Sequence, residues 1–144
     1  MTLYILDTDH LSLFDHNHPT VVRCVLAARK RTANKLATTV ISFEEQLKGR
    51  LAQVGKAAAQ PTQLVLAYKR LAMTIDSFVG ITALNYSADA DSRFREFRSV
   101  GVRIGTQDLR IASIVLASGG VLVTRNRQDF KQVPGLLLED WSVE

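Results

Sequence analysis

Residues 2–10 read TLYILDTDH and combine a strand signal with a functional one. Leu3 to Leu6 form a short apolar run that is typical of a buried strand, and Asp7 ends it abruptly. A carboxylate is costly to bury without a partner. Because ligands bind at the carboxyl ends of strands in open parallel α/β sheets, Asp7 is predicted to be a site residue at a strand tip. This prediction requires other acids at equivalent positions.

Length and composition indicate one globular domain spanning residues 1–144. No apolar run approaches the roughly 20 residues that a membrane-spanning helix needs, so no membrane association is expected. The N-terminus begins with the strand signal rather than the basic segment of a signal peptide. Cys24 is the only cysteine, which excludes an internal disulfide. We therefore expect a cytoplasmic protein.

The net charge of +4 is unevenly distributed along the chain. Between Arg23 and Arg70 there are ten lysines or arginines and only two acids, Glu44 and Glu45. Small acidic spots on a basic protein suit a site that holds cations and receives a polyanion. A merely solubilising surface explains the same charge pattern equally well.

Strand signals alternate with helix signals throughout the chain, which predicts an α/β fold with a mainly parallel central sheet flanked by helices. Thr8 is expected to cap the first helix, and Pro19 to begin the second. Strands are expected at residues 3–6, 36–41, 78–84, 121–124 and 136–138. Helices are expected at residues 9–14, 19–31, 42–55, 61–75, 88–100 and 108–118, with a turn or short helix at 126–130.

Three further acids occur where the chain leaves a strand or enters a helix. Glu45 follows the second expected strand by four residues, Asp108 lies in the first turn of an apolar helix, and Asp129 follows the strand at 121–124. Each has a local explanation as well. Ser42 and Glu45 have the spacing of a capping box, Asp108 suits a helix dipole, and Asp129 suits a turn.

Taken together, Asp7, Glu45, Asp108 and Asp129 are better explained as one site. Four carboxylates at one sheet edge would repel each other and raise one another's pKa values, and a divalent cation removes that conflict. Hard oxygen ligands favour Mg²⁺ or Mn²⁺. The sequence has no Cys/His set for zinc, and surface roles are expected for its histidines, His10, His16 and His18.

A carboxylate-bound Mg²⁺ at this edge suits hydrolysis of a phosphodiester. Arg110 is close to Asp108 in sequence, and Arg125 and Arg127 are close to Asp129. These arginines are therefore candidates to contact the phosphate.

Four ordered motifs resemble those of the PIN-domain ribonucleases, and in particular the VapC-like toxins of bacterial toxin–antitoxin pairs. The motifs are ILDTDHLS at 5–12, Ser42-x-x-Glu45-x-x-x-Gly49, IGTQDLRIA at 104–112 and TRNRQDF at 124–130. Later residues, VPGL at 133–136 and EDW at 139–141, are similar to that family's C-terminus. The resemblance covers the whole chain.

This resemblance implies a single PIN-like domain and a Mg²⁺-dependent endoribonuclease that acts on RNA. It also implies inhibition by a small antitoxin and assembly into a homodimer. By position, Asp7, Glu45, Asp108 and Asp129 match the family's acidic quartet. Thr124 and Asn126 match its supporting polar residues. Asp9, which stands where the family often has Asn, is a further supporting candidate that would either add a ligand or only cap the first helix. The apolar residues of 64–75 and 111–117 are candidates for a dimer surface, or for plain core.

Three alternatives remain open at this point. Leu6-Asp7-Thr8-Asp9 begins like the nucleophile loop of haloacid-dehalogenase-like phosphatases, but Leu11 stands where that loop needs Thr or Ser. A non-catalytic RNA- or protein-binding module would use the basic region equally well. A PIN nuclease of RNA maturation would share every feature above.

Overall fold

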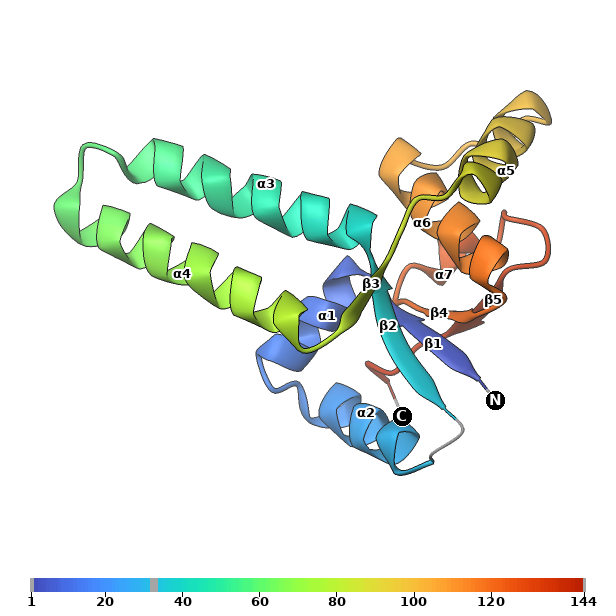
Figure 1. The fold of residues 1–144 in the computed structure, drawn as a ribbon, viewed down its shortest axis with the longest axis horizontal. Coiled ribbons are helices and arrows are strands. Elements are labelled where there is room, and N and C mark those ends of the chain that lie inside the picture. The colour runs from blue at the N-terminus through green and yellow to red at the C-terminus, as the bar shows by residue number, and fades with distance from the viewer. Residues whose placement is uncertain (1, 32–33, 144) are drawn as a thin grey trace.

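A computed structural model describes residues 2–31 and 34–143. Within these ranges, five strands form one sheet in the order β3-β2-β1-β4-β5, and all neighbouring strands are parallel (Figure 1). The α/β fold with a parallel central sheet is therefore confirmed. The strands are β1 (Leu3–Leu6), β2 (Lys35–Thr39), β3 (Thr82–Leu84), β4 (Val121–Val123) and β5 (Leu137–Glu139).

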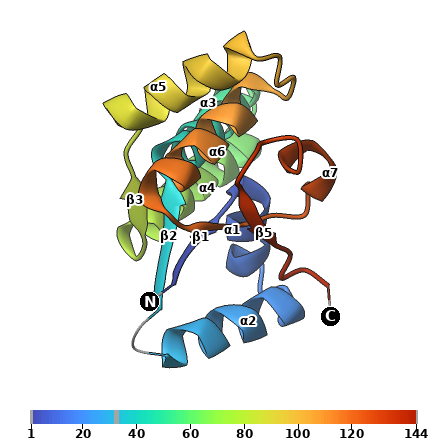
Figure 2. The same cartoon turned by 90° about the vertical axis from the view of Figure 1, so that its right-hand side faces the viewer.

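Helices cover both faces of the sheet. Figure 2 shows α5 and α6 on one side of the strands and α2 on the other. The long helices α3 and α4 form an antiparallel hairpin that projects away from the sheet (Figure 1). The helices are α1 (Thr8–Asp15), α2 (Pro19–Lys30), α3 (Val40–Ala57), α4 (Pro61–Val79), α5 (Ala88–Ser99), α6 (Thr106–Ser118) and α7 (Arg127–Phe130).

The central strand β1 is buried on both faces, which explains its unbroken apolar run. Successive side chains point to opposite faces of a strand, so Ile5 and Leu6 enter different cores. Ile5 packs in a cluster with Ile111 and Ile114 of α6, whereas Leu6 packs with Val25 of α2. Most of the apolar residues at 111–117 therefore belong to the core rather than to a dimer surface.

Two expected strand boundaries were wrong, because apolar residues that were expected in the strands belong to helices. Val40 and Ile41 begin α3, since the Thr39 side chain accepts a hydrogen bond from the Ser42 N–H and caps the helix. Phe78 completes the last turn of α4, where its ring packs edge-on against Phe43 with centroids 4.6 Å apart. Apolar character alone does not separate a buried strand from a buried helix end.

Smaller shifts occur elsewhere in the chain. Asp7, rather than Thr8, is the N-cap of α1, and Thr8 is the first residue of that helix. The strands β4 and β5 each differ by one residue at their ends from the expected ranges. No helix within the described residues is long and apolar enough to cross a membrane.

The close packing of β4 against β1 makes Gly120 a sensitive position. A Cβ at Gly120 would lie 2.8 Å from Ile5 Cδ1 and 2.9 Å from the Leu3 carbonyl oxygen. We expect Gly120→Ala to lower the free energy of unfolding by roughly 1–3 kcal/mol, measured by urea denaturation.

Gly49→Ala is the matched control, because a Cβ there meets no atom within 4 Å and Gly49 lies inside α3. This change should raise the free energy of unfolding by about 0.5–1 kcal/mol. Equal stability of the two variants would contradict the packing described here.

Candidate active site

Asp7 leaves the sheet at the carboxyl end of β1, as predicted. Its backbone N–H donates to the Val123 carbonyl of β4 at 3.1 Å, which continues the pairing of the two strands. Its carboxylate Oδ1 accepts the backbone N–H of His10 at 2.8 Å and caps α1. The Asp7 side chain is only 10% exposed. Strand end, helix start and burial together hold this carboxylate in one place.

Glu45 reaches α1 rather than its own helix end. The Thr8 hydroxyl donates to Glu45 Oε1 at 2.9 Å across 37 residues of sequence. Ser42 is fully buried and bonds with Thr39, so Thr39 rather than Ser42 caps α3 and the expected Ser42–Glu45 capping box is replaced. Thr8 was missed as a functional candidate because its sequence position suggests only a cap.

Asp108 lies in the first turn of α6 and is half-buried. The pKa of Asp108 is raised to about 6, first by burial and then, in that order, by the negative charges of Glu45, Asp7, Asp129 and Asp9. The predicted acids, which are far apart in sequence, therefore act on one carboxyl group. Across residues 2–31 and 34–143, no lysine or arginine forms an ion pair with Glu45, Asp108 or Asp129.

Asn126 orients Asp129 at the start of the short helix α7. Its amide Nδ2 donates to Asp129 Oδ2 at 3.0 Å, and its Oδ1 accepts the Asp129 N–H at 3.4 Å. The hydroxyl oxygen of Thr124 in turn accepts the Asn126 N–H at 3.0 Å. Both predicted supporting residues thus act on the backbone and side chain that carry Asp129.

The acids interact electrostatically but are not in direct contact with one another. In the part of the chain that the structure describes, no three acidic, histidine or cysteine side chains already form a cluster that could hold a metal ion. Repulsion between carboxylates acts over longer distances than the about 2.0–2.1 Å of a Mg²⁺–oxygen bond. The acids thus lie near enough to act on the charge of Asp108, but the described residues do not form a preassembled metal-binding cluster.

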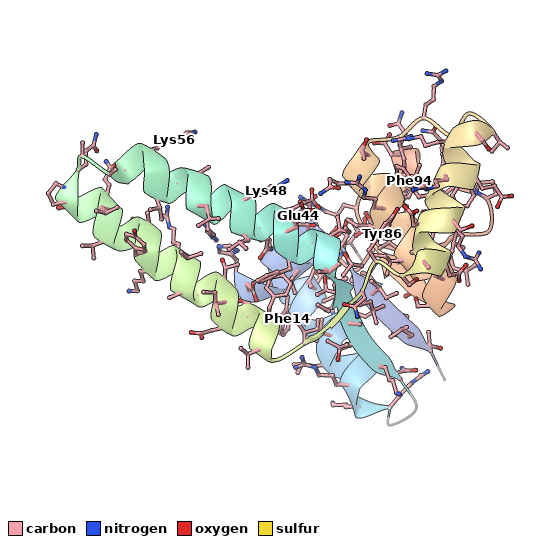
Figure 3. The ribbon with its side chains drawn as sticks, turned by 45° about the horizontal axis from the view of Figure 1, so that its top comes forward. Phe14, Glu44, Lys48, Lys56, Tyr86 and Phe94 are labelled. Carbon is pink, nitrogen blue, oxygen red and sulfur yellow. The ribbon has the colours of Figure 1, made fainter. Side chains whose placement is uncertain are left out.

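The predicted arginines have different surroundings. Arg110 donates to Gln107 Oε1 at 2.7 Å and lies over the Phe94 ring, 5.5 Å from its centroid. Figure 3 shows Phe94 with Tyr86 and Glu44 where α3 approaches α5 and α6. Arg110 is thus engaged on the α5 side of α6.

The other predicted arginines follow β4. Arg125 forms an exposed ion pair with Asp9, at 3.7 Å between Arg125 Nη2 and Asp9 Oδ2. Arg127 is exposed at the start of α7. Its position beside the Asn126–Asp129 turn is compatible with the predicted phosphate contact.

An open pocket of about 540 Å³ adjoins the acids, and Asp129 contributes to its wall. Arg98 and Arg103, from the end of α5 and the following loop, line the same pocket. The Arg98 guanidinium holds this loop by donating to the carbonyls of Val102 and Ile104, each at 2.9 Å. These two arginines were not predicted from the sequence as site candidates. The available signal was their position on either side of Gly101, shortly before the helix that carries Asp108.

The surface role expected for His10 was wrong. His10 is fully buried, because the first turn of α1 places it directly beneath Asp7. His16 is exposed, and its Nδ1 lies 2.7 Å from the Ser12 carbonyl oxygen. His18 caps α2 by accepting the Val21 N–H.

Two known proteins show local sequence similarity to this chain. Ribonuclease VapC2 of Rickettsia felis is 36% identical over 72 residues, which span 46% of this chain and 54% of that protein. The tRNA(fMet)-specific endonuclease VapC of Salmonella typhimurium is 30% identical over 81 residues, 53% of this chain and 61% of that protein. The matched segments thus span little more than half of these relatives. No protein-family model matches the chain.

The fold comparison covers nearly the whole chain. The structure of VapBC2 from Rickettsia felis, bound to a DNA fragment from its promoter, aligns with a TM-score of 0.74 and 24% identity. The alignment covers 97% of this chain and 99% of that one. The resemblance to VapC-like PIN-domain proteins is confirmed: the local sequence similarity is to VapC ribonucleases, and the fold is that of a VapBC chain.

The raised pKa of Asp108 predicts a charge-dependent stability in metal-free protein. The pKa of Asp108 is about 6 in the folded state, against an ordinary value of 3.8. Ionised Asp108 therefore lowers the free energy of unfolding, and this penalty reaches its full size above pH 6. This penalty disappears as the pH falls below the ordinary value. With chelator present, Asp108→Asn should be more stable than wild type at pH 8 by about 1 kcal/mol, after allowance for solvent screening.

Urea denaturation at pH 8 and at a pH below 4 tests this expectation, since the advantage of Asp108→Asn should vanish at the lower pH. Asp89→Asn is the control, because Asp89 is exposed on α5, where it forms an ion pair with Arg93. Its effect should stay within about 0.5 kcal/mol at both pH values. A destabilising Asp108→Asn at pH 8 would contradict the electrostatic description.

Proposed function

We propose that this chain is a Mg²⁺- or Mn²⁺-dependent endoribonuclease that hydrolyses RNA phosphodiester bonds in the cytoplasm, as a VapC-like toxin. One observation carries the proposal. Burial and, after it, the charges of Glu45, Asp7 and Asp129 raise the pKa of Asp108. Within the described residues neither Glu45, Asp108 nor Asp129 has a basic ion-pair partner. Unbalanced negative charge of this kind calls for a cation.

The donor set fits a hard divalent cation. It consists of carboxylate oxygens with hydroxyl and amide groups around them, which suits Mg²⁺ or Mn²⁺ better than a soft metal. Asp7, Asp108, Asp129 and Glu45 would hold the ion. When bound, such an ion lowers the pKa of a coordinated water and neutralises charge on a phosphodiester.

The chain's own residues orient these acids and receive the substrate. Thr8 restrains Glu45, Asn126 restrains Asp129, and the strand end restrains Asp7. Arg103 and Arg127 lie exposed beside the acids and are placed to hold phosphate groups. The negative charge of RNA would meet these side chains before it approaches the carboxylates.

The basic region offers a longer surface for RNA. Lys48 follows Glu44 by one turn of α3, and Lys56 lies near the far end of the same helix (Figure 3). Lysines at this spacing suit contact with the phosphate backbone rather than with bases. The names of the two relatives, a ribonuclease and a tRNA-specific endonuclease, support RNA as the substrate class.

The alternatives have less support. Leu11 is buried in the core, where it supplies no hydroxyl to a phosphatase loop. A pure binding module gains nothing from four unneutralised carboxylates that oppose a polyanion. A nuclease of RNA maturation would have the same site. It would differ from a toxin in its partner protein and not in its chemistry.

Adjacent glutamates on α3 provide a matched test of the site. Glu45 bonds to Thr8 and its charge raises the pKa of Asp108, whereas Glu44 bonds to Gln107 and Lys48 and is not among the charges that raise this pKa. Glu45→Gln should weaken Mn²⁺ binding and slow RNA cleavage by at least about 100-fold, since even outer-shell changes cost 10–100-fold. Glu44→Gln should change both by less than threefold.

Titration calorimetry with Mn²⁺ and gel assays of a labelled RNA measure the two effects. Hydrolysis of p-nitrophenyl phosphate without RNA cleavage would instead favour the phosphatase. Equal Mn²⁺ binding by both glutamine variants and wild type would remove Glu45 from the site.

We also propose a homodimer through α4. Val65, Tyr68, Ala72, Ile75 and Val79 recur at alternating spacings of three and four residues and form one outward stripe. Val65 is 71% exposed and Val79 is 82% exposed, so this stripe lies outside the core of the described chain. Such a heptad pattern is typical of a helix that packs against another helix.

Charge favours a second copy as the occupant of this stripe. Lys69 and Asp76 lie beside it, one on each side of Ala72 along the helix. In an antiparallel pair centred near Ala72, Lys69 of each copy would approach Asp76 of the other. Self-complementary charge at such flanking positions selects partner and orientation.

A lysine in the stripe should separate the copies. We expect Ile75→Lys to sediment as a monomer at micromolar concentration, where wild type sediments as a dimer. Met73→Lys is the control, because Met73 is similarly exposed but lies on another side of α4. A monomeric wild type, or a dimeric Ile75→Lys variant, would contradict this proposal.

The VapBC assembly of the structural neighbour supports an antitoxin partner for this chain. A toxin requires a small inhibitory protein, for which the gene immediately upstream is the natural candidate. Co-expression of that gene should restore the growth of cells that produce this chain. A maturation nuclease would need no such rescue.

A further inference from the structure

The buried His10 connects Asp7 to the C-terminal segment of the chain. Its Nδ1 lies 3.3 Å from Asp7 Oδ1, and its Nε2 lies 3.1 Å from the backbone nitrogen of Trp141. The ring is fully buried, and the Asp7 side chain is 10% exposed. His10 therefore touches one proposed metal-binding carboxylate and a segment that follows it by more than 130 residues.

The partners of the ring assign its protons. A backbone N–H only donates, so the Trp141 N–H requires a lone pair on Nε2. The proton of the neutral ring is then on Nδ1 and faces Asp7.

Asp140 Oδ1 also lies near Nε2, at 3.4 Å, but it already accepts the N–H and the hydroxyl of Ser142 at 2.8 and 2.6 Å. A ring protonated on both nitrogens would still direct Nδ1–H at Asp7. The donor toward Asp7 is thus common to both states.

We propose that His10 is a positioning residue, which holds the Asp7 carboxylate in the orientation that metal binding needs. This inference rests on the proposed metal-dependent function. The backbone N–H and the Nδ1–H of His10 both donate to Oδ1 of Asp7. They fix that oxygen and leave Oδ2 to the site.

The C-terminal segment keeps the ring in this orientation. Trp141 packs against Tyr4 of β1, with ring centroids 5.1 Å apart, and its Nε1 donates to Glu139 Oε1 at 3.0 Å. The Trp141 N–H is therefore held in place when it donates to His10. Outer-shell bonds of this kind orient a ligand and raise metal affinity.

Two substitutions separate the two hydrogen bonds of the ring. In His10→Asn, the side-chain amide can replace the Nδ1–H donor toward Asp7 but cannot reach Trp141. In His10→Gln, the longer amide can replace Nε2 as acceptor for Trp141 but removes the donor at the Nδ1 position. Each variant loses one bond and some packing, so thermal denaturation should show both to be folded and less stable than wild type.

Mn²⁺ affinity, measured by calorimetry or electron paramagnetic resonance below both melting transitions, is the deciding quantity. We expect His10→Asn to bind within about threefold of wild type, and His10→Gln to bind about tenfold more weakly or worse. Asp7→Asn serves as the reference for loss of the carboxylate itself. A structural role alone would lower both melting temperatures without this difference in metal affinity.

Several results would overturn the inference, and they are distinguishable from failure of the proposed function. If wild type binds Mn²⁺ and Asp7→Asn does not, equal affinity of the two His10 variants removes the positioning role alone. If wild type binds no Mn²⁺, the metal site and this inference both fail. Long-range ¹H–¹⁵N spectra that place the single ring proton on Nε2 would also overturn it.

Discussion

The structure depends on one electrostatic conflict, the concentration of carboxylates around a half-buried Asp108. Burial, followed by the negative charges of Glu45, Asp7 and Asp129, raises the pKa of this group to about 6. A fold selected for stability alone would separate these groups or pair them with arginine. The parallel sheet instead brings its carboxyl edge and the starts of three helices toward one place.

Polar contacts restrain three of the acids. Asp7 and Asp129 accept local hydrogen bonds from His10 and Asn126, and Glu45 accepts one from Thr8, 37 residues earlier in the chain. These bonds restrain the carboxylates without neutralising them. The result is a set of restrained acids whose charge remains unbalanced, which favours the binding of a hard cation.

The α3–α4 hairpin has a separate role from the sheet. Only its base belongs to the acidic site, through Glu45, and the rest of the hairpin projects away from the sheet (Figure 1). The projecting helices carry basic residues on α3 and an exposed apolar stripe on α4. One supersecondary element thus links the acidic site to the surfaces proposed for RNA and for a second copy.

The sequence by itself determined the class of fold and the four acids, because strand runs and helix periods depend on local chemistry and Asp7, Glu45, Asp108 and Asp129 each follow such a boundary. It did not determine where α3 begins or what surrounds His10. Those outcomes depend on Thr39 capping α3 and on Trp141 returning to α1 from the far end of the chain. Contacts between residues so far apart in sequence are decided by the tertiary structure alone, because a local sequence pattern does not specify which distant groups are buried together.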